Sequence, residues 1–181
     1  MSFWKNFFTS TKIYNKIITK NQVYPLSVDK ILLIEGLQID GQKQRVYISL
    51  NNQIDIYDLE KLCDAVGWVR RPVKKVKIAI EHSFLTVSLF CDNDHKRQLI
   101  GFARATSDNA FNATIWDVVI HPEFQGHGLG KTLMNQTIKY LRHADISTIT
   151  LFADPNVVAF YSNLGFVTDP DGVKGMFWYP L

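Results

Sequence analysis

The chain has 181 residues, of which 46% are hydrophobic and 20% charged, and its formal net charge is +3 at pH 7. This length suits one domain plus a short extension, and no apolar run approaches the roughly 18 residues of a membrane span. Two cysteines, Cys63 and Cys91, give no disulfide framework and favour a reducing compartment. Lysines are scattered through residues 1–20, which argues against a secretory signal.

The positive charge is concentrated at the N-terminus. Residues 1–30 hold five lysines against Asp29, a balance of +4, so residues 31–181 come to about −1. A nearly neutral domain argues against a nucleic-acid groove. We therefore divide the chain into a basic, aromatic extension (1–30) and a domain (31–181). Residues 1–20 are either a loosely ordered tail or a basic amphipathic helix in weak contact with a membrane or partner.

From Arg45 onward the hydrophobic pattern alternates between strand and helix spacing. Residues 46–50 predict a short strand, and Asp55 can cap the helix that follows. Pro72 predicts the start of a second helix, whose inward residues should be Val73, Val76 and Ile80. Two strands, 84–91 and 99–106, should flank a polar loop at 92–98.

The second half of the chain predicts a β-α-β order. Residues 113–121 predict a strand, and a long helix from Leu129 has its apolar residues on one face. Residues 148–153 predict another strand, Asp154-Pro155 the start of a helix, and 176–179 a final strand. We predict a mixed α/β fold, a central twisted mixed sheet with helices on both faces.

The most specific pattern is at residues 113–131, which predict a strand, a His-Pro turn, a glycine loop and a helix start. Gln125, Gly128 and Gly130 have the spacing Gln-x-x-Gly-x-Gly, and Gly126 also lies in the loop. Glycine lets backbone N–H groups approach a ligand, and N–H groups at a helix N-terminus lack helical partners. The segment therefore predicts an anion cradle of the kind that holds a pyrophosphate.

Two common phosphate-binding loops do not fit this segment. A P-loop ends in Gly-Lys-Ser/Thr, as residues 130–132 do, but it requires a glycine where Gln125 stands. A dinucleotide-binding loop requires Gly-x-Gly-x-x-Gly, whereas the glycines here are at 126, 128 and 130.

The motif Gln-x-x-Gly-x-Gly after a strand resembles the acyl-CoA-binding motif of the GNAT superfamily of N-acetyltransferases. Residues 151–166 are similar to that family's strand, short helix and Tyr-x-x-x-Gly-Phe ending. Residues 67–72, 114–118 and 172–178 resemble its plastid branch, which includes chloroplast serotonin N-acetyltransferases and uncharacterised acetyltransferases of algal plastids. The resemblance covers about residues 45–181 and implies acetyl-CoA as cosubstrate and a plastid or bacterial-type cytoplasmic location.

The resemblance also implies which residues bind acetyl-CoA. In the family the strand before the loop bonds the pantetheine arm and the thioester carbonyl through its backbone, and such donors stabilise an oxyanion. The loop and helix start hold the pyrophosphate. The implied residues are Val118, Val119, Ile120, Gln125, Gly126, His127, Gly128, Leu129, Gly130, Lys131 and Asn156.

Tyr161 stands where the family has a tyrosine that protonates the departing thiolate. A phenol with a pKa of about 10 is a suitable acid for a thiolate. The alternative is a core aromatic beside Phe160 and Phe166.

Asp117 is predicted in mid-strand, where a carboxylate is costly unless it is paired or wet. Strict alternation places it on the face of Ile115 and Val119. It is either a general base with a raised pKa or the partner of Arg104 in a buried ion pair. Both interpretations stay open.

Other polar residues have structural interpretations. Asp154 stands where many family members have an asparagine that bonds the cofactor, and helix capping explains it. We expect His121 and His127 to be positional or solvent-exposed. No cluster suggests a metal site, and the cysteines lack the context of a nucleophile, which favours direct attack in a ternary complex.

Trp68, Arg70 and Arg71 fall where family members admit the acceptor, or they form a plug between helices. The expected acceptor is a primary amine, either an arylalkylamine such as serotonin or tryptamine or a protein lysine. We expect a monomer or homodimer. The competing hypothesis is a non-catalytic module that binds acetyl-CoA and reports its level to a partner.

Overall fold

The computed structural model describes residues 30–39, 41–93 and 96–179, which fall into two compact units. The larger unit ends at Phe152 and the smaller begins at Ala153. The predicted extension, Lys30 excepted, lies outside the described residues. No helix in the described chain is long and apolar enough to cross a membrane.

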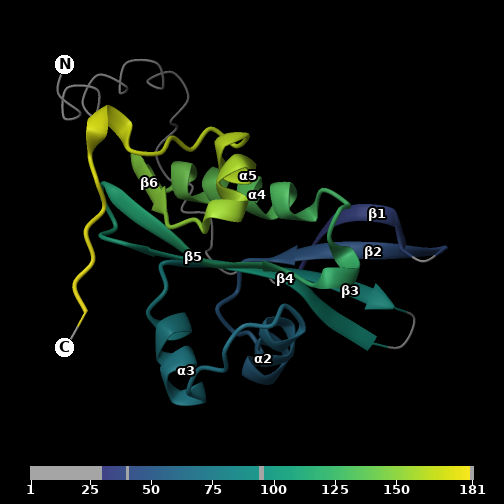
Figure 1. The fold of residues 1–181 in the computed structure, drawn as a ribbon. Helices are drawn as coiled ribbons and strands as arrows, with labels where there is room; N and C mark the ends of the chain where they lie inside the picture. The colour runs from purple at the N-terminus through teal and green to yellow at the C-terminus, as the bar shows by residue number, and fades with distance from the viewer. Residues whose placement is uncertain (1–29, 40, 94–95, 180–181) are drawn as a thin grey trace, which may run out of the picture. The chain divides into compact units, whose positions relative to one another are not determined.

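The larger unit is built on a six-stranded sheet whose strands lie side by side in chain order (Figure 1). Neighbours are antiparallel from β1 to β5, and β5 and β6 are parallel. A parallel pair requires a crossover, which α4 (Leu129–His143) supplies. The strands are β1 (Ile31–Ile39), β2 (Gln42–Ser49), β3 (Leu85–Asn93), β4 (Lys96–Ser107), β5 (Asn112–Ile120) and β6 (Thr148–Leu151).

Helices cover both faces of this sheet, as the sequence predicts. α2 (Ile56–Ala65) and α3 (Val73–Glu81) lie on one face and α4 on the other (Figure 1). Each helix buries one apolar side against the strands, which is the arrangement that their spacing favours. The core on the α2 side joins Leu59, Leu62, Val76 and Ile80 of the helices to Leu99, Phe102 and Val119 of the sheet.

The two helices on this face begin where the sequence predicts. The Asp55 carboxylate accepts a hydrogen bond from the Tyr57 backbone N–H at 2.8 Å and so caps α2. Pro72 immediately precedes α3. Val73, expected to face inward, is exposed at the first position of the helix, and the buried side is set by Val76 and Ile80.

Two parts of the sheet differ from the prediction. β1 was not predicted, because Glu35 and Gly36 interrupt its apolar pattern and its ladder with β2 is irregular at two places. Most of the expected polar loop at 92–98 continues the β3–β4 hairpin, in which Asp92 pairs with Arg97. Opposite charges facing each other across two strands favour this pairing despite the polar composition.

The smaller unit contains η3 (Pro155–Val157), α5 (Val158–Ser162) and η4 (Pro170–Gly172). Asp154 precedes η3 but its side chain makes no capping hydrogen bond, so the capping interpretation is wrong; its carbonyl accepts from the Val157 N–H at 3.0 Å instead. The final strand predicted at 176–179 is also wrong, because these residues are exposed and have no ladder partner among the described residues. Apolar composition without pairing does not make a strand.

Candidate active site

Strand β5 contains a bulge at Asp117. Phe102 of β4 pairs with Val119, and Arg104 pairs with Trp116. The segment of β5 between these two pairs is therefore one residue longer than the segment of β4 that faces it. Asp117 has a φ of +54°, a conformation that aspartate tolerates better than most residues. Bulges of this kind re-aim a side chain out of the regular alternation.

The bulge overturns the predicted alternation along β5. Ile115 pairs with Ala105 and Val119 with Phe102, and positions 102 and 105 of β4 point to opposite faces. Ile115 and Val119 therefore lie on opposite faces of the sheet. Because they are four residues apart, regular alternation predicted that they would share one face. Val119 belongs to the core beneath α2 and α3.

The Asp117 carboxylate bridges two arginines. Arg104 Nε donates to one oxygen at 2.5 Å, and Arg71 Nη1 donates to the other at 2.9 Å. The Asp117 and Arg104 side chains are 16% and 14% exposed, and Arg71 is 41% exposed. The predicted pair with Arg104 is therefore present, and Arg71 adds a second bond that ties the α2–α3 loop to the bulge.

This geometry suits a positioning role for Asp117. Each oxygen of the carboxylate accepts a hydrogen bond from a different arginine, so both oxygens are engaged in holding the bulge. Charge-assisted hydrogen bonds to both oxygens also fix the orientation of the side chain. The general-base role of Asp117 stays a prediction.

Strands β5 and β6 pair over only part of their length. Their ladder runs from Asn112 and Thr148 to Ile115 and Leu151. Beyond it, Trp116, Val119 and Ile120 pair with β4 and no residue of 116–120 pairs with β6, so one edge of this stretch has no strand partner among the described residues. Residues 118–120, which the resemblance assigns to the pantetheine arm, lie on this open stretch.

The glycine loop places a row of backbone N–H groups at the start of α4. Gly126 and Gly128 have φ values of +79° and +78°, which favour glycine, and a Cβ on either would meet nothing within 4 Å. Among the described residues, no acceptor bonds the N–H groups of residues 126–131, whereas the Thr132 N–H bonds the Gly128 carbonyl at 3.0 Å. Open N–H groups at a helix N-terminus form an anion cradle.

Two side chains next to the loop have separate roles. Gln125 Nε2 donates to the Ile120 carbonyl at 2.9 Å and so fastens the loop to β5. His127 is exposed, as expected. The His121 side chain is only 19% exposed, which fits the positional alternative of the two that we expected for it.

Tyr161 lies among aromatic residues in the smaller unit. Its ring centroid is 5.0 Å from that of Phe160 and 6.1 Å from that of Phe166, both edge-on. Burial raises the pKa of the phenol, and the Asp154 carboxylate raises it further. The phenol therefore carries its proton throughout the neutral range, as an acid must, and the acid role stays a prediction. Asn156 is exposed in η3.

The family model described as Acetyltransferase (GNAT) family matches residues 54–166. The chain belongs to this family. The chain is 63% identical to the uncharacterized N-acetyltransferase ycf52 of Gracilaria tenuistipitata var. liui, and the match covers the whole length of both proteins. It is 49% identical over 89% of its length to the histone acetyltransferase TAP1 of Glycine max, covering 72% of that protein.

Further relatives agree with the predicted branch and fold. The GNAT chain is 45% identical to the chloroplastic GCN5-related N-acetyltransferase 2 of Arabidopsis thaliana, over 89% of this chain and 69% of the relative. A GNAT-family acetyltransferase of Streptococcus pneumoniae TIGR4 shares the fold, with a TM-score of 0.62 at 21% identity over 75% of this chain and 98% of that chain. The predictions of the fold and of an N-acetyltransferase are confirmed.

The two thiols of the GNAT chain are poor nucleophiles. Burial raises the pKa of Cys63, although the nearby Arg71 guanidinium opposes the rise. Burial also raises the pKa of Cys91, and a raised pKa lowers the fraction of reactive thiolate. In the described part of the chain, no group of three or more His, Cys, Asp or Glu residues could hold a metal ion.

The α2–α3 loop presents one exposed aromatic side chain. Trp68 is 37% exposed, and its backbone N–H bonds the Cys63 carbonyl at 3.1 Å. Arg70 is engaged by Asp64 through two hydrogen bonds of 3.1 and 2.6 Å, and Arg71 by Asp117. Of the three loop residues that we singled out, Trp68 is thus the best placed to meet a ligand.

Trp116, beside the bulge, was not among the predicted site residues. It is half-exposed, its indole N–H donates to Thr106 Oγ1 at 3.0 Å, and its ring centroid is 5.4 Å from that of Phe152. The sequence feature that could have drawn attention to Trp116 is its place next to an aspartate in the middle of a predicted strand.

Proposed function

We propose that the protein transfers the acetyl group of acetyl-CoA to a primary amine. The observation that carries the proposal is the row of N–H groups at residues 126–131, which no described residue bonds. These groups lie at the N-terminal end of a fifteen-residue helix, where the helix dipole favours an anion. A pyrophosphate has the charge and the several acceptor oxygens that such a row requires.

The residues present fit acetyl-CoA as the acyl donor. The backbone of residues 126–131, with the exposed Lys131 side chain, would hold the pyrophosphate. The open edge of β5 at residues 118–120 would bond the pantetheine arm and the thioester carbonyl. Preorganised donors aimed at a developing oxyanion are worth about 2.7–4 kcal/mol each in other enzymes.

The donor supplies an activated thioester, and the chain would supply orientation and a proton. We assign Tyr161 as the acid that gives its phenol proton to the departing thiolate, following the resemblance. The amine attacks in its neutral form, and the proton that it loses on forming the amide restores the phenol, directly or through water. We assign Asp117 as a positioning residue that holds the bulge and the α2–α3 loop in register. Because both thiols are poor nucleophiles, we propose direct attack by the amine in a ternary complex rather than an acetyl-cysteine.

Two acceptor classes have specific support. An arylalkylamine such as tryptamine could stack on the half-exposed Trp68, a contact worth about 0.5–1.5 kcal/mol beyond burial. A protein lysine is the second candidate, because a relative at 49% identity is named a histone acetyltransferase. Relatives named chloroplastic support a plastid location.

The experiment that tests this function is thiol release from acetyl-CoA against a panel of arylalkylamines, aliphatic amines and lysine peptides. We expect release that depends on the amine and that forms one acetylated amine per thiol. Tight binding of acetyl-CoA without amine-dependent release would favour the non-catalytic module.

A further inference from the structure

Two aromatic side chains stand at the point where β5 and β6 stop pairing. The ladder between these strands ends at Ile115 and Leu151, and Trp116 and Phe152 are the next residues along the chain on each side. Their ring centroids are 5.4 Å apart, so the two rings meet across the end of the ladder. Trp116 is 37% exposed and Phe152 55%, and both belong to the larger unit. We call these two residues the aromatic pair.

The aromatic pair lies on the side of the sheet that α2 and α3 cover. Trp116 pairs with Arg104 across β4, and directly opposed residues share a face. The Arg104 side chain bonds Asp117, which Arg71 joins to the α2–α3 loop. On the same face the indole N–H donates to Thr106 Oγ1 at 3.0 Å. The indole ring therefore keeps an exposed surface and is held by a polar bond, as a wall of a binding site is.

The proposed course of the acyl donor leads to this pair, so the present inference rests on the proposed function. The glycine loop follows β5 in the chain. An arm that starts from a pyrophosphate at residues 126–131 therefore passes Ile120 before it reaches Val118. Its thioester end lies next to Asp117 and Trp116. Beyond that point β6 pairs with β5 and occupies the backbone edge that the arm would follow.

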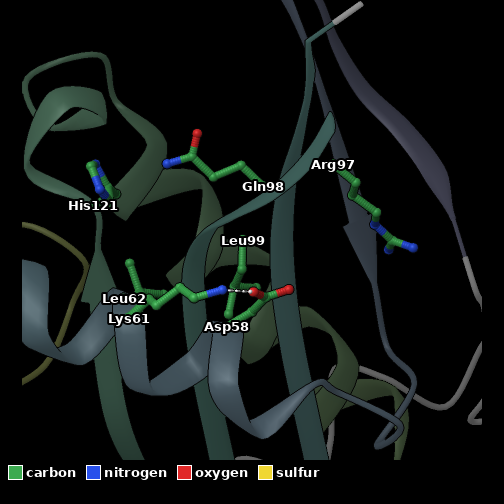
Figure 2. A pocket seen from close by; sticks show the side chains of 7 residues that line it. All are labelled: Asp58, Lys61, Leu62, Arg97, Gln98, Leu99 and His121. Carbon is green, nitrogen blue, oxygen red and sulfur yellow. Dashed lines mark hydrogen bonds and ion pairs between the residues drawn. The ribbon is translucent and has the colours of Figure 1, made fainter. Parts of the chain in front are cut away.

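The surroundings of this point leave little room for a long acyl group. On the α4 side Ile115 is 2% exposed and belongs to the packed interior. On the other side stands the aromatic pair. A hollow of about 310 Å³ beside α2 lies at the opposite end of the open stretch, because His121, which lines it in Figure 2, directly follows Ile120. A chain that extends from the thioester would therefore meet the aromatic pair first.

We infer that Trp116 and Phe152 limit the length of the acyl group, so that the enzyme uses acetyl-CoA and rejects propionyl- and butyryl-CoA. The reaction is the same for each donor: the bond from the acyl carbon to the amine nitrogen forms, the bond to the thiol sulfur breaks, and only the acyl chain differs. Forcing extra methylenes against a packed wall is destabilising. Sites that exclude one methylene discriminate by about 10–200-fold.

The test measures thiol release from acetyl-, propionyl- and butyryl-CoA with one amine acceptor. In the parent, kcat/KM should fall at least about tenfold with each added methylene. In Trp116→Ala and in Phe152→Ala the ratio of the butyryl value to the acetyl value should rise at least about tenfold. Both donors are compared in one sample, so a partly unfolded variant still reports this ratio. Equal use of the donors by the parent, or parental ratios in both variants, would show the inference to be wrong.

Two further variants serve as controls. Phe111→Ala should keep the parental ratio, because Phe111 is an exposed aromatic residue that immediately precedes the opposite end of the β5–β6 ladder. Trp116→Phe keeps a ring but loses the bond to Thr106, so it should relax the ratio less than Trp116→Ala. A raised KM for the amine with an unchanged donor ratio would place the aromatic pair in the acceptor site and overturn the inference.

Binding separates this inference from the proposed function. In calorimetric titration without an amine, the parent should bind butyryl-CoA at least about tenfold more weakly than acetyl-CoA, and Trp116→Ala should bind the two within about threefold. If no amine in the panel is acetylated, the proposed reaction fails and these affinities decide the inference. Equal affinity of the parent for the two donors would then contradict it. Binding of neither donor would contradict both.

Discussion

Arg71 and Asp117 are joined by a hydrogen bond of 2.9 Å between groups 46 residues apart in the chain. The bond connects the loop between α2 and α3 to the one residue of β5 that adopts a left-handed backbone conformation. Arg104 bonds the other oxygen of the same carboxylate. The loop, the bulge and β4 thus meet at one carboxylate, which accepts a hydrogen bond from each side.

Asp117→Asn should lower stability and leave substantial activity. Asparagine also tolerates a positive φ, but it removes the charge from two hydrogen bonds, so we expect a loss of about 1–3 kcal/mol in the free energy of unfolding. Denaturant titration and a pH–rate profile measure the two effects. The acidic limb of the profile should persist, whereas a general base at Asp117 predicts that the limb disappears and that kcat collapses.

Arg71→Met should act mainly on the acceptor. Arg71 is more exposed than Arg104, so its removal should cost less stability than Arg104→Met. Release of the α2–α3 loop should raise the KM for the amine, with little change in acetyl-CoA affinity. Arg70→Met is the matched control, since Arg70 bonds Asp64 within the same loop region. This substitution should change neither the KM for the amine nor the affinity for acetyl-CoA. If Arg70→Met and Arg71→Met raised the KM for the amine equally, the proposed role of Asp117 in holding the α2–α3 loop would be wrong.

Tyr161→Phe should lower kcat by about 10²–10⁴-fold, the usual worth of a general acid, with acetyl-CoA affinity nearly unchanged. Burial and Asp154 raise the pKa of the phenol above 10, so the protonated form survives to higher pH than in a free tyrosine. Activity of the parent should therefore fall only at pH above 10, and this alkaline limb should be missing from the Phe variant. Equal kcat values would reduce Tyr161 to a packing residue.

Trp68→Ala should raise the KM for tryptamine by up to about tenfold, because it removes one aromatic stacking contact. The KM for a lysine peptide should change less. Val69→Ala, at an exposed neighbouring position, serves as the control. If both substrates lose equally, or if only lysine peptides are acetylated, the arylalkylamine hypothesis is wrong and protein acetylation is the better assignment.

The sequence predicts best those helices that bury one apolar face and whose ends are set by neighbouring residues. α2 and α4 follow from helical spacing of apolar residues, and the Asp55 cap and Pro72 start follow from local backbone chemistry. The segment at 176–179 fails because a strand depends on a partner that its own composition does not specify.

The site was predictable only in part, for a physical reason. The glycine loop is a contiguous pattern, so its place at the start of α4 could be predicted. The bulge could not, because alternation assumes a regular step and one left-handed residue shifts every later side chain. The Arg71–Asp117 bond had no signal either, since it joins segments that only the folded sheet brings together.

The cradle at residues 126–131 is tested most directly by calorimetric titration of acetyl-CoA into the parent protein, Gly128→Ala and Gly128→Glu. Both substitutions strain a residue at φ +78°, and only glutamate adds a negative charge and bulk in the space that a pyrophosphate would occupy. We expect micromolar-range binding by the parent, moderately weaker binding by Gly128→Ala and no measurable binding by folded Gly128→Glu. Equal affinities of the Ala and Glu variants would contradict the assignment of this loop to the pyrophosphate.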